Sequence, residues 1–258
     1  MLNIMNAASI DPDKINIFFT YNKEPFSNDK WNKYSKQISK SFLERVLKYR
    51  RWQDRQNALT GRLLLKTAIT RLPDRDMYRA LNIRDSIDID SYGKPYFKQS
   101  LQDITIISKQ GRSLAKKDHE NFSKIKTPPM INFNISHSGN YAVCALHSCK
   151  TGIDIEKIKP VNINDFHSVL TSKEKEFIEK SGSPLKDFYH IWTRKESVIK
   201  AHGTGLSTGL SSFCVMNPSV ELHGDIWHLY PFSIDEGYVG HAAAQKENLD
   251  ISKYRIFF

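Results

Sequence analysis

One amphipathic helix constrains the fold of the second half of this chain more than any other feature. Between Leu185 and His202, apolar side chains recur at helical spacing, and Gly203 provides a stop signal. Lys195 falls in the middle of the apolar stripe, and such violations of the pattern concentrate at functional sites. The alternative for Lys195 is an apolar stem with its charged head in water. The stripe itself consists of Phe188, Ile191, Trp192, Val198 and Ile199.

The segment Gly152-Ile153-Asp154-Ile155-Glu156 is typical of a strand. Side chains alternate along a strand, so Asp154 and Glu156 share one face. Two carboxylates at this spacing repel each other unless a cation lies between them. Because carboxylate oxygens favour Mg²⁺, the pattern indicates a magnesium site. The alternative is a solvent-facing strand with two screened acids.

The remaining pattern alternates strands and helices. We expect Ser41 and Glu44 to form a capping box at the start of a basic helical region, which extends over one or two helices to Pro73. Residues 109–130 are polar and indicate a long surface loop. The other predicted elements are a strand over 15–21, a turn over 93–95, two strands within 133–146 around a turn at 136–139, a helix over 171–181, and further strands up to 254–258.

Charge is distributed unevenly along the 258 residues. Residues 1–150 carry 26 Lys and Arg against 14 Asp and Glu, whereas residues 151–258 carry 12 against 14. A basic half predicts an anionic partner, such as nucleic acid, a phosphorylated cofactor or an acidic protein. We therefore expect two halves, 1–149 and 150–258, that meet in the connection around Ser148–Thr151.

Several classes of protein are disfavoured. No run of 18 apolar residues would span a membrane, and the first twelve residues do not resemble a secretory signal. Cys144, Cys149 and Cys214 include no Cys-x-x-Cys, which argues against a disulfide framework or a structural zinc site and fits a reducing cytosol. Neither a P-loop nor a Gly-x-Gly-x-x-Gly motif occurs. These observations favour a cytoplasmic location and no membrane partner.

Three candidate sites have ordinary structural alternatives. Thr171 and Glu174 match a capping box, so Glu174 has a structural reason to be there. Glu196 and Lys200 are spaced for an i,i+4 salt bridge. His137 is either a phosphate contact or an ordinary turn histidine.

Taken together, the motifs resemble those of the 4′-phosphopantetheinyl transferases of the larger, surfactin-synthetase-activating type. The Gly-x-Asp-x-Glu strand is followed, 36 residues after Glu156, by Trp-x-x-Lys-Glu-Ser-x-x-Lys, and this combination is highly specific. The resemblance is carried by Gly93-Lys94-Pro95, by residues 133–139, by residues 152–156, and by residues 192–200 with the following Gly203-Thr204-Gly205-Leu206.

The resemblance implies an α+β fold with two similar halves that form a pseudo-dimer, with the active site in the cleft between them. It implies a Mg²⁺-dependent enzyme that moves the phosphopantetheine arm of coenzyme A to a serine of an apo carrier domain and releases adenosine 3′,5′-bisphosphate. The chain is expected to act as a monomer. Its carrier could belong to a fatty-acid synthase, a polyketide or peptide synthetase, or an aminoadipate reductase.

The resemblance also assigns roles to individual residues. Glu174 is expected to act as the general base, and Lys195 to stabilise charge or assist proton transfer. The metal ligands would be Asp154, Glu156 and Glu196. The coenzyme A contacts would be Arg45 at the 3′-phosphate, Gly93, Lys94 and Pro95 along the adenosine, and Ser136, His137 and Lys200 around the phosphates.

Three other functions compete with this one. The net charge of +10 and the basic residues over 45–66 suit a nucleic-acid-binding module, whose affinity would fall steeply with salt. An inactive relative that binds a carrier is disfavoured by the intact carboxylates and Lys195. A metal-dependent phosphohydrolase would use the same carboxylates but leaves Gly93-Lys94-Pro95 without a role.

Overall fold

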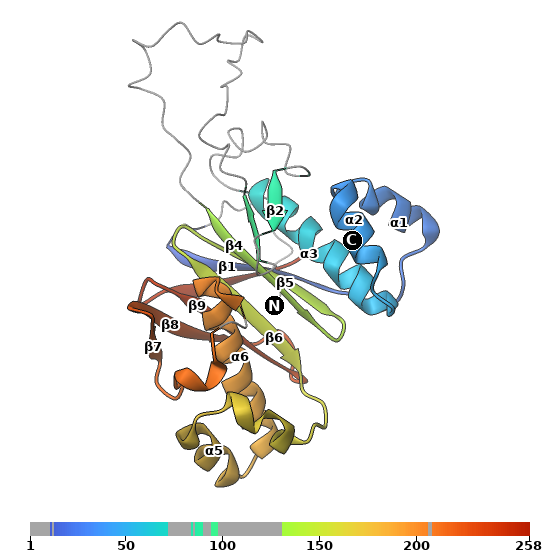
Figure 1. Ribbon diagram of the computed structural model, residues 1–258. Helices are drawn as coiled ribbons and strands as arrows, with labels where there is room; N and C mark the ends of the chain where they lie inside the picture. Colours follow the sequence, from blue (N-terminus) through green and yellow to red (C-terminus); the bar gives the residue numbers. More distant parts are fainter. Residues whose placement is uncertain are drawn as a thin grey trace, which may run out of the picture.

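Two four-stranded sheets form the centre of the computed structural model (Figure 1). The first sheet has the strand order β10-β1-β5-β4 and the second has the order β6-β9-β8-β7. The first contains β1 (Lys14–Tyr21), β4 (Asn132–Ser138), β5 (Tyr141–His147) and β10 (Asp250–Arg255). The second contains β6 (Thr151–Lys157), β7 (Ser219–Leu222), β8 (Asp225–Phe232) and β9 (Tyr238–Ala244). A separate hairpin consists of β2 (Ile87–Ile89) and β3 (Pro95–Phe97).

The structure describes residues 11, 13–71, 84, 86–89, 94–97, 131–205 and 208–258. The polar loop predicted over 109–130 lies outside the described residues, as do Gly93 and Leu206 of the sequence motifs. Among the helices that are described, none has the length and hydropathy needed to cross a membrane.

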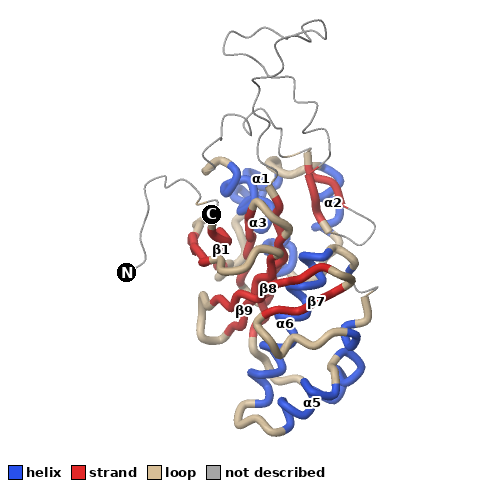
Figure 2. Tube along the Cα trace, turned by 90° about the vertical axis from the view of Figure 1, so that its left-hand side faces the viewer, coloured by secondary structure: helices blue, strands red, loops and turns tan. Residues whose placement is uncertain are grey.

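Apart from α6, the α-helices lie at the two ends of the molecule (Figure 2). One end carries α1 (Asn28–Ser35), α2 (Lys40–Leu47) and α3 (Trp52–Ile69), and the other carries α5 (Ser172–Glu179). The long helix α6 (Pro184–His202) runs from α5 toward the sheets. The short 3₁₀ segments η3 (Ile163–Val169) and η5 (Leu210–Ser212) flank this region of the chain.

The predicted basic helical region is confirmed as two helices, α2 and α3, but its start was placed wrongly. The N-cap of α2 is Ser39, whose hydroxyl accepts a hydrogen bond from the Phe42 amide at 3.4 Å. The predicted capping box of Ser41 and Glu44 is therefore wrong, because Ser41 already lies inside the helix. Helix α1 was not predicted at all. The ends of α6 fit expectation, with Pro184 in its first turn and Gly203 in the left-handed region at φ +94°.

The elements stack in four layers: α3, the first sheet, the second sheet and α6. Strand alternation explains this order, because β1 directs Phe18 toward α3 and directs Ile15, Ile17 and Phe19 toward the second sheet. A shared core fills the space between the sheets. It includes Val143 and Ala145 from the first sheet and Ile153, Ile155 and Ala242 from the second. The expected α+β class is confirmed, while the pseudo-dimer relation stays a prediction.

One strand of the second half crosses into the first sheet near the end of the chain. Strand β10 leaves the second half and pairs in parallel with β1, from Lys14 opposite Asp250 to Phe19 opposite Arg255. The predicted boundary at 149/150 falls in the short connection between β5 and β6. It stays a prediction for the division into domains, because the first sheet contains a strand from beyond it.

Helix α6 lies directly on β6 because Gly152 has no side chain. A Cβ atom at Gly152 would clash with the backbone of Ser197 and Ala201. This close approach brings the functional face of α6 against the strand that carries Asp154 and Glu156. The glycine of the Gly-x-Asp-x-Glu motif therefore has a packing role.

Candidate active site

Strands β4 and β6 are neighbouring edge strands of the two sheets, joined by side-chain hydrogen bonds. Ser136 Oγ donates to Asp154 Oδ1 at 2.8 Å, and Ser138 Oγ donates to Glu156 Oε2 at 2.5 Å. The Ile153 amide donates to Asn134 Oδ1 at 3.1 Å. Hydroxyls from one half of the molecule thus hold the carboxylates of the other.

Helix α6 adds a cation to these carboxylates. Lys200 Nζ lies 2.6 Å from Asp154 Oδ1 and donates to Ser136 Oγ at 3.0 Å. The i,i+4 salt bridge between Lys200 and Glu196 does not occur among the ion pairs of the described residues. Lys200 therefore pairs across to β6 instead of along its own helix. Asp154 is only 3% exposed, which excludes the alternative of a solvent-facing strand.

The carboxylates of this site repel one another. Burial, followed by the charge of Asp154, raises the pKa of Glu156 to about 7, although the Ser138 hydrogen bond and Lys200 oppose this shift. Burial also raises the pKa of Glu196, where Lys200 opposes the shift and Asp154 adds to it. Burial alone would lower the pKa of Lys200, but Asp154, Glu196 and Glu156 together raise it. Three acids therefore share the positive charge of one lysine.

The donor set fits a small divalent cation. Asp154 Oδ2 is buried and has no hydrogen-bond partner among the described residues. An unsatisfied buried carboxylate oxygen is costly, and Mg²⁺ commonly takes one or two carboxylates and completes its shell with water and phosphate oxygens. In the described part of the chain, no three His, Cys, Asp or Glu side chains are already gathered as a metal centre. The fit therefore rests on the chemistry of the donors and on the unpartnered oxygen.

His137 is not in a turn, contrary to the prediction. It lies on β4, and the turn between β4 and β5 consists of Gly139 and Asn140. The tight turn uses the left-handed conformation of Gly139 at φ +55°. Burial, together with Lys200, lowers the pKa of His137, which favours the neutral imidazole. Its predicted phosphate contact stays a prediction.

Glu174 and Lys195 form a fully buried ion pair. Lys195 Nζ lies 2.9 Å from Glu174 Oε2, and both side chains have no exposed surface. Glu174 also accepts from the Thr171 amide at 2.8 Å and from the Val215 amide at 2.9 Å, and its capping box with Thr171 is complete. Lys195 donates to the carbonyls of Leu210 and Phe213 as well.

These contacts exclude the snorkelling alternative for Lys195, but they do not test the catalytic roles of Glu174 and Lys195. The snorkelling alternative for Lys195 is excluded, because its ammonium does not reach water. Within the described residues, no hydrogen bond or ion pair connects Glu174 or Lys195 with Asp154, Glu156 or Lys200. The geometry gives Glu174 and Lys195 a structural role, and their catalytic roles stay predictions.

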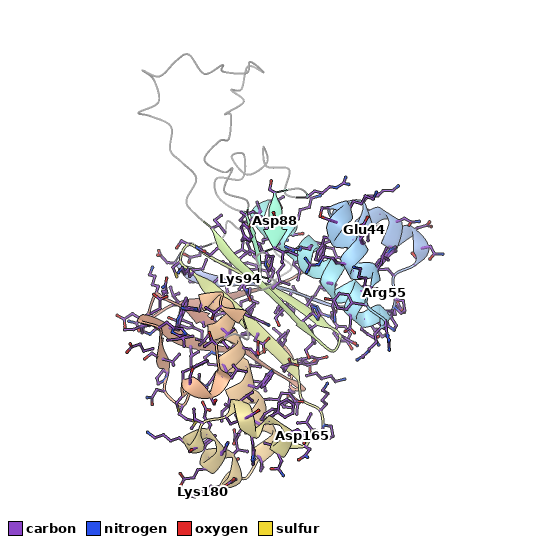
Figure 3. The ribbon with its side chains drawn as sticks, viewed as in Figure 1. Glu44, Arg55, Asp88, Lys94, Asp165 and Lys180 are labelled. Atoms are coloured by element: carbon purple, nitrogen blue, oxygen red, sulfur yellow. The ribbon has the colours of Figure 1, made fainter. Side chains whose placement is uncertain are left out.

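The predicted coenzyme A contacts lie in three places. Lys94 Nζ donates to the Ala201 carbonyl at 3.0 Å, so it connects the β2–β3 hairpin with the end of α6. Figure 3 shows Lys94 near the centre of the molecule, with Glu44 and Arg55 at one end and Lys180 at the other. Pro95 begins β3 beside Lys94. Arg45 is exposed on α2 and makes no hydrogen bond to the carboxylate site among the described residues.

Sequence reasoning missed Ser138 and the role of Gly152. Ser138 lies two residues after Ser136 on the same strand face, so the same alternation that paired Asp154 with Glu156 could have paired the serines. The missing information was that β4 is a strand through Ser138 and lies beside β6, which no local pattern reveals.

Two family profiles match the chain. One, described as "4'-phosphopantetheinyl transferase superfamily", matches residues 150–243. The other, described as "4'-phosphopantetheinyl transferase, N-terminal", matches residues 24–149. Together they span both the carboxylate strand with α6 and the helices of the basic half.

Curated relatives agree with these profiles. The chain is 30% identical over 211 residues to the 4'-phosphopantetheinyl transferase Sfp of Bacillus subtilis strain 168, covering 81% of this chain and 77% of that protein. It is 27% identical over 231 residues to the Bacillus subtilis 4'-phosphopantetheinyl transferase ffp, covering 86% and 88%. It is 31% identical over 191 residues to the L-aminoadipate-semialdehyde dehydrogenase-phosphopantetheinyl transferase of Mus musculus, covering 70% and 53%.

The profiles and relatives show the class of protein, a transferase, and the structure shows its two-sheet α+β architecture with a carboxylate and lysine centre between its halves. The chain belongs to the 4′-phosphopantetheinyl transferase superfamily, as the Sfp relationship over most of both chains shows. The resemblance inferred from the sequence is confirmed, and none of these descriptions names a nucleic acid.

Proposed function

We propose that this protein transfers the 4′-phosphopantetheine arm of coenzyme A to a serine hydroxyl of an apo carrier domain. The observation that carries the proposal is the cluster of Asp154, Glu156, Glu196 and Lys200 between β6 and α6, in a chain of this superfamily. In the reaction, the serine oxygen bonds to the β-phosphorus of coenzyme A, and the bond from that phosphorus to the bridging oxygen breaks. Adenosine 3′,5′-bisphosphate leaves.

Catalysis of phosphoryl-type transfer consists mainly of positioning and of neutralising charge on oxygen. Lys200 is suited to contact a pyrophosphate oxygen, because its ammonium lies beside the proposed metal ligand Asp154 on β6 and beside Ser136 on β4. Ser136 holds Asp154 from the opposite strand. His137 lies on the other face of β4 from Ser136, the face shared by Phe133 and Ile135, and its pKa is lowered toward the neutral imidazole. The sequence motif supports its phosphate contact.

Asp154, Glu156 and Glu196 would hold Mg²⁺, which when bound supplies Lewis-acid neutralisation of the pyrophosphate charge. The unpartnered Oδ2 of Asp154 and the mutual repulsion of the acids support this assignment. Lys94, Pro95 and Gly93 would lie along the adenosine, and Arg45 would contact the 3′-phosphate. The sequence motifs support these four assignments.

The serine proton needs an acceptor. The motif assigns this role to Glu174, whose carboxylate is buried and accepts from Thr171, Val215 and Lys195. A carboxylate with these contacts also stabilises the chain at Val215, after η5, so the base and structural roles of Glu174 predict different outcomes for Glu174→Gln.

The partner would be an apo carrier domain of a fatty-acid synthase, a polyketide or peptide synthetase, or an aminoadipate reductase. The names of several relatives refer to L-aminoadipate-semialdehyde dehydrogenase, which supports the last of these. Carrier domains are acidic around their serine, and the basic half would attract them electrostatically. We propose a cytoplasmic monomer that uses no nucleic acid and no membrane.

The test is intact-mass spectrometry of purified apo carrier domains mixed with this protein, coenzyme A and Mg²⁺, with an EDTA arm. We expect each accepted carrier to gain the mass of one phosphopantetheine group, and the gain to disappear with EDTA. Asp154→Ala should abolish the gain while the protein keeps its fold by circular dichroism. Wild-type turnover by Asp154→Ala would contradict the carboxylate site, and salt-sensitive binding to DNA without binding of coenzyme A would favour the nucleic-acid alternative.

A further inference from the structure

Ser138 is the last residue of β4 and makes two hydrogen bonds to β6. Its hydroxyl donates to Glu156 Oε2 at 2.5 Å and accepts from the Lys157 amide at 3.1 Å. Both contacts cross from β4 in the first sheet to β6 in the second. In the described part of the chain, this hydrogen bond is the one that fixes the Glu156 carboxylate.

The turn that follows Ser138 is held from both halves of the molecule. From α3, Asn57 Nδ2 donates to the Gly139 carbonyl at 2.9 Å. From β9, the Tyr238 hydroxyl accepts from the Asn140 amide at 3.2 Å. A Cβ atom at Gly139 would clash with that hydroxyl, so the turn and Tyr238 are in close contact. Figure 1 shows the β4–β5 hairpin between the α1–α3 end and β6.

A buried polar network fixes Asn57 in turn. Asn22 Nδ2 donates to Asn57 Oδ1 at 2.8 Å and to Thr60 Oγ1 at 3.0 Å. Gln56 Nε2 donates to Asn22 Oδ1 at 3.1 Å. All four side chains are at most 3% exposed. A satisfied buried network of this kind gives each member one orientation.

We infer that Ser138 is a positioning residue, which holds the Glu156 carboxylate toward Asp154, and that the Gly139–Asn140 turn fixes Ser138 from both halves. The inference rests on the proposed function, because the orientation of Glu156 matters to the reaction only if the carboxylates bind a cation. Without the hydroxyl, repulsion from Asp154 would turn Glu156 away from the site.

The expected effect is on cation affinity. Groups that orient a metal-binding side chain typically contribute 10- to 100-fold to metal affinity. We therefore expect Ser138→Ala to weaken Mn²⁺ binding at least about 10-fold. The probe is Mn²⁺ alone, titrated into the full chain and followed by electron paramagnetic resonance, so the readout does not depend on turnover.

Two companion variants separate positioning from folding. Ser138→Thr keeps a hydroxyl at the same place and should restore most of the affinity. Ser148→Ala removes an exposed serine hydroxyl just beyond the other strand of the hairpin and should change nothing, since the Ser148 contact is made by its backbone carbonyl. Melting temperatures of all variants are measured in parallel.

Tyr238→Phe tests the turn. Removing the hydroxyl frees the Asn140 amide and should weaken Mn²⁺ binding in the wild-type background. In the Ser138→Ala background it should have little further effect, because the path from the turn to Glu156 is already broken. Additive effects in this double-mutant cycle would overturn the role of the turn.

The outcomes distinguish the inference from the proposed function. If the wild type does not bind Mn²⁺, the proposed cation site fails and the inference fails with it. If the wild type binds Mn²⁺ and Ser138→Ala binds it equally well, the proposed site stands and the inference is overturned. If Ser138→Thr does not restore affinity, the hydroxyl is not what positions Glu156, and the inference is overturned as well.

Discussion

The ion pair of Glu174 and Lys195 lies outside the carboxylate site and has no solvent contact. Two charges without solvent contact are costly unless each makes further hydrogen bonds. Here Glu174 accepts from two backbone amides and Lys195 donates to two backbone carbonyls. The pair therefore connects the start of α5, the middle of α6 and the chain around η5.

Glu174→Gln should mainly destabilise the protein. Glutamine keeps the shape but leaves the Lys195 ammonium buried without a counter-charge, and breaking such a pair costs about 3–5 kcal/mol. Denaturant unfolding checks this loss, with Glu176→Gln as the matched control. Glu176 lies on the same helix in an exposed ion pair with Lys180, and such pairs contribute about 0–1 kcal/mol. Unchanged stability with a large fall in turnover would instead support Glu174 as the base.

Sequence analysis found the members of this pair but not the pair itself. Lys195 was a candidate because it interrupts an apolar stripe, and Glu174 because it matches the general base of the family that the sequence resembles, with a capping box as its structural alternative. Which residues contact each other depended on how α5 packs on α6 and on where the chain returns at Val215. Those contacts are tertiary, and no periodicity in the sequence encodes them.

At the scale of elements, the site depends on the contact between α6 and β6. Alternation along residues 152–156 correctly placed Asp154 and Glu156 on one face of the strand, and the structure shows Ile153 and Ile155 on the other face, in the core. The predicted turn at 136–139 was wrong, because β4 pairs with β5 as far as Ser138 and the turn consists of Gly139 and Asn140. Alternation within one strand could not predict this, since the register of a hairpin depends on both strands.

Gly152→Ala should separate α6 from β6. The added methyl would meet the backbone of Ser197 and Ala201, which cannot move like a flexible side chain. Overpacking typically lowers the free energy of unfolding by about 1–3 kcal/mol, and we expect a loss near the upper end of this range. We also expect weaker Mn²⁺ binding. Calorimetry and Mn²⁺ titration check both. Gly182→Ala is the control, because no atom lies within 4 Å of a Cβ there. Equal melting temperatures for the two variants would contradict the close contact.

At the scale of the whole molecule, stability should depend on the protonation of His241. Arg194 Nε donates to His241 Nε2 at 3.4 Å, so Nδ1 carries the proton toward Thr193 Oγ1 at 2.8 Å. The Thr193 hydroxyl then donates to the Tyr189 carbonyl. This arrangement accommodates the neutral imidazole. Burial, followed by the charges of Arg194 and His190, lowers the pKa of His241 to about 3.

The sign of the resulting pH dependence follows from linkage. A histidine in the unfolded chain has a pKa near 6.5. Between this pH and about 3, His241 binds a proton in the unfolded chain but stays neutral in the folded chain. Stability should therefore fall as pH decreases from about 6.5 toward 3, by up to about 1.4 kcal/mol per pH unit from this residue. Unfolding free energies between pH 5 and 7 should show a shallower slope for His241→Gln. Exposed His167→Gln should keep the wild-type slope, and an unchanged slope for His241→Gln would exclude His241 as the cause.

Strand β10 of the second half completes the first sheet, so we expect the two halves not to fold separately. Parallel pairing of β10 with β1 joins residues more than 200 positions apart, so a boundary read from charge and turn signals could not include it. Residues 256–258, which follow β10, also contact the first half. Ile256 donates its amide to the Phe19 carbonyl at 2.8 Å, and the Phe258 ring lies 5.7 Å from that of Tyr34.

Deleting residues 250–258 should therefore unfold the first half. It should also lower the stability of the second half, because the two sheets share one core. Val143 and Ala145 pack in the same core as Ile153 and Ala242, so the sheets stabilise each other. We expect the truncated chain to lose near-ultraviolet dichroism, whereas the full chain should unfold in one transition by two probes. Phe257→Ala is the control, because that side chain is 76% exposed. A truncated chain that keeps a folded core over 150–249 would instead show that the boundary at 149/150 separates independent domains.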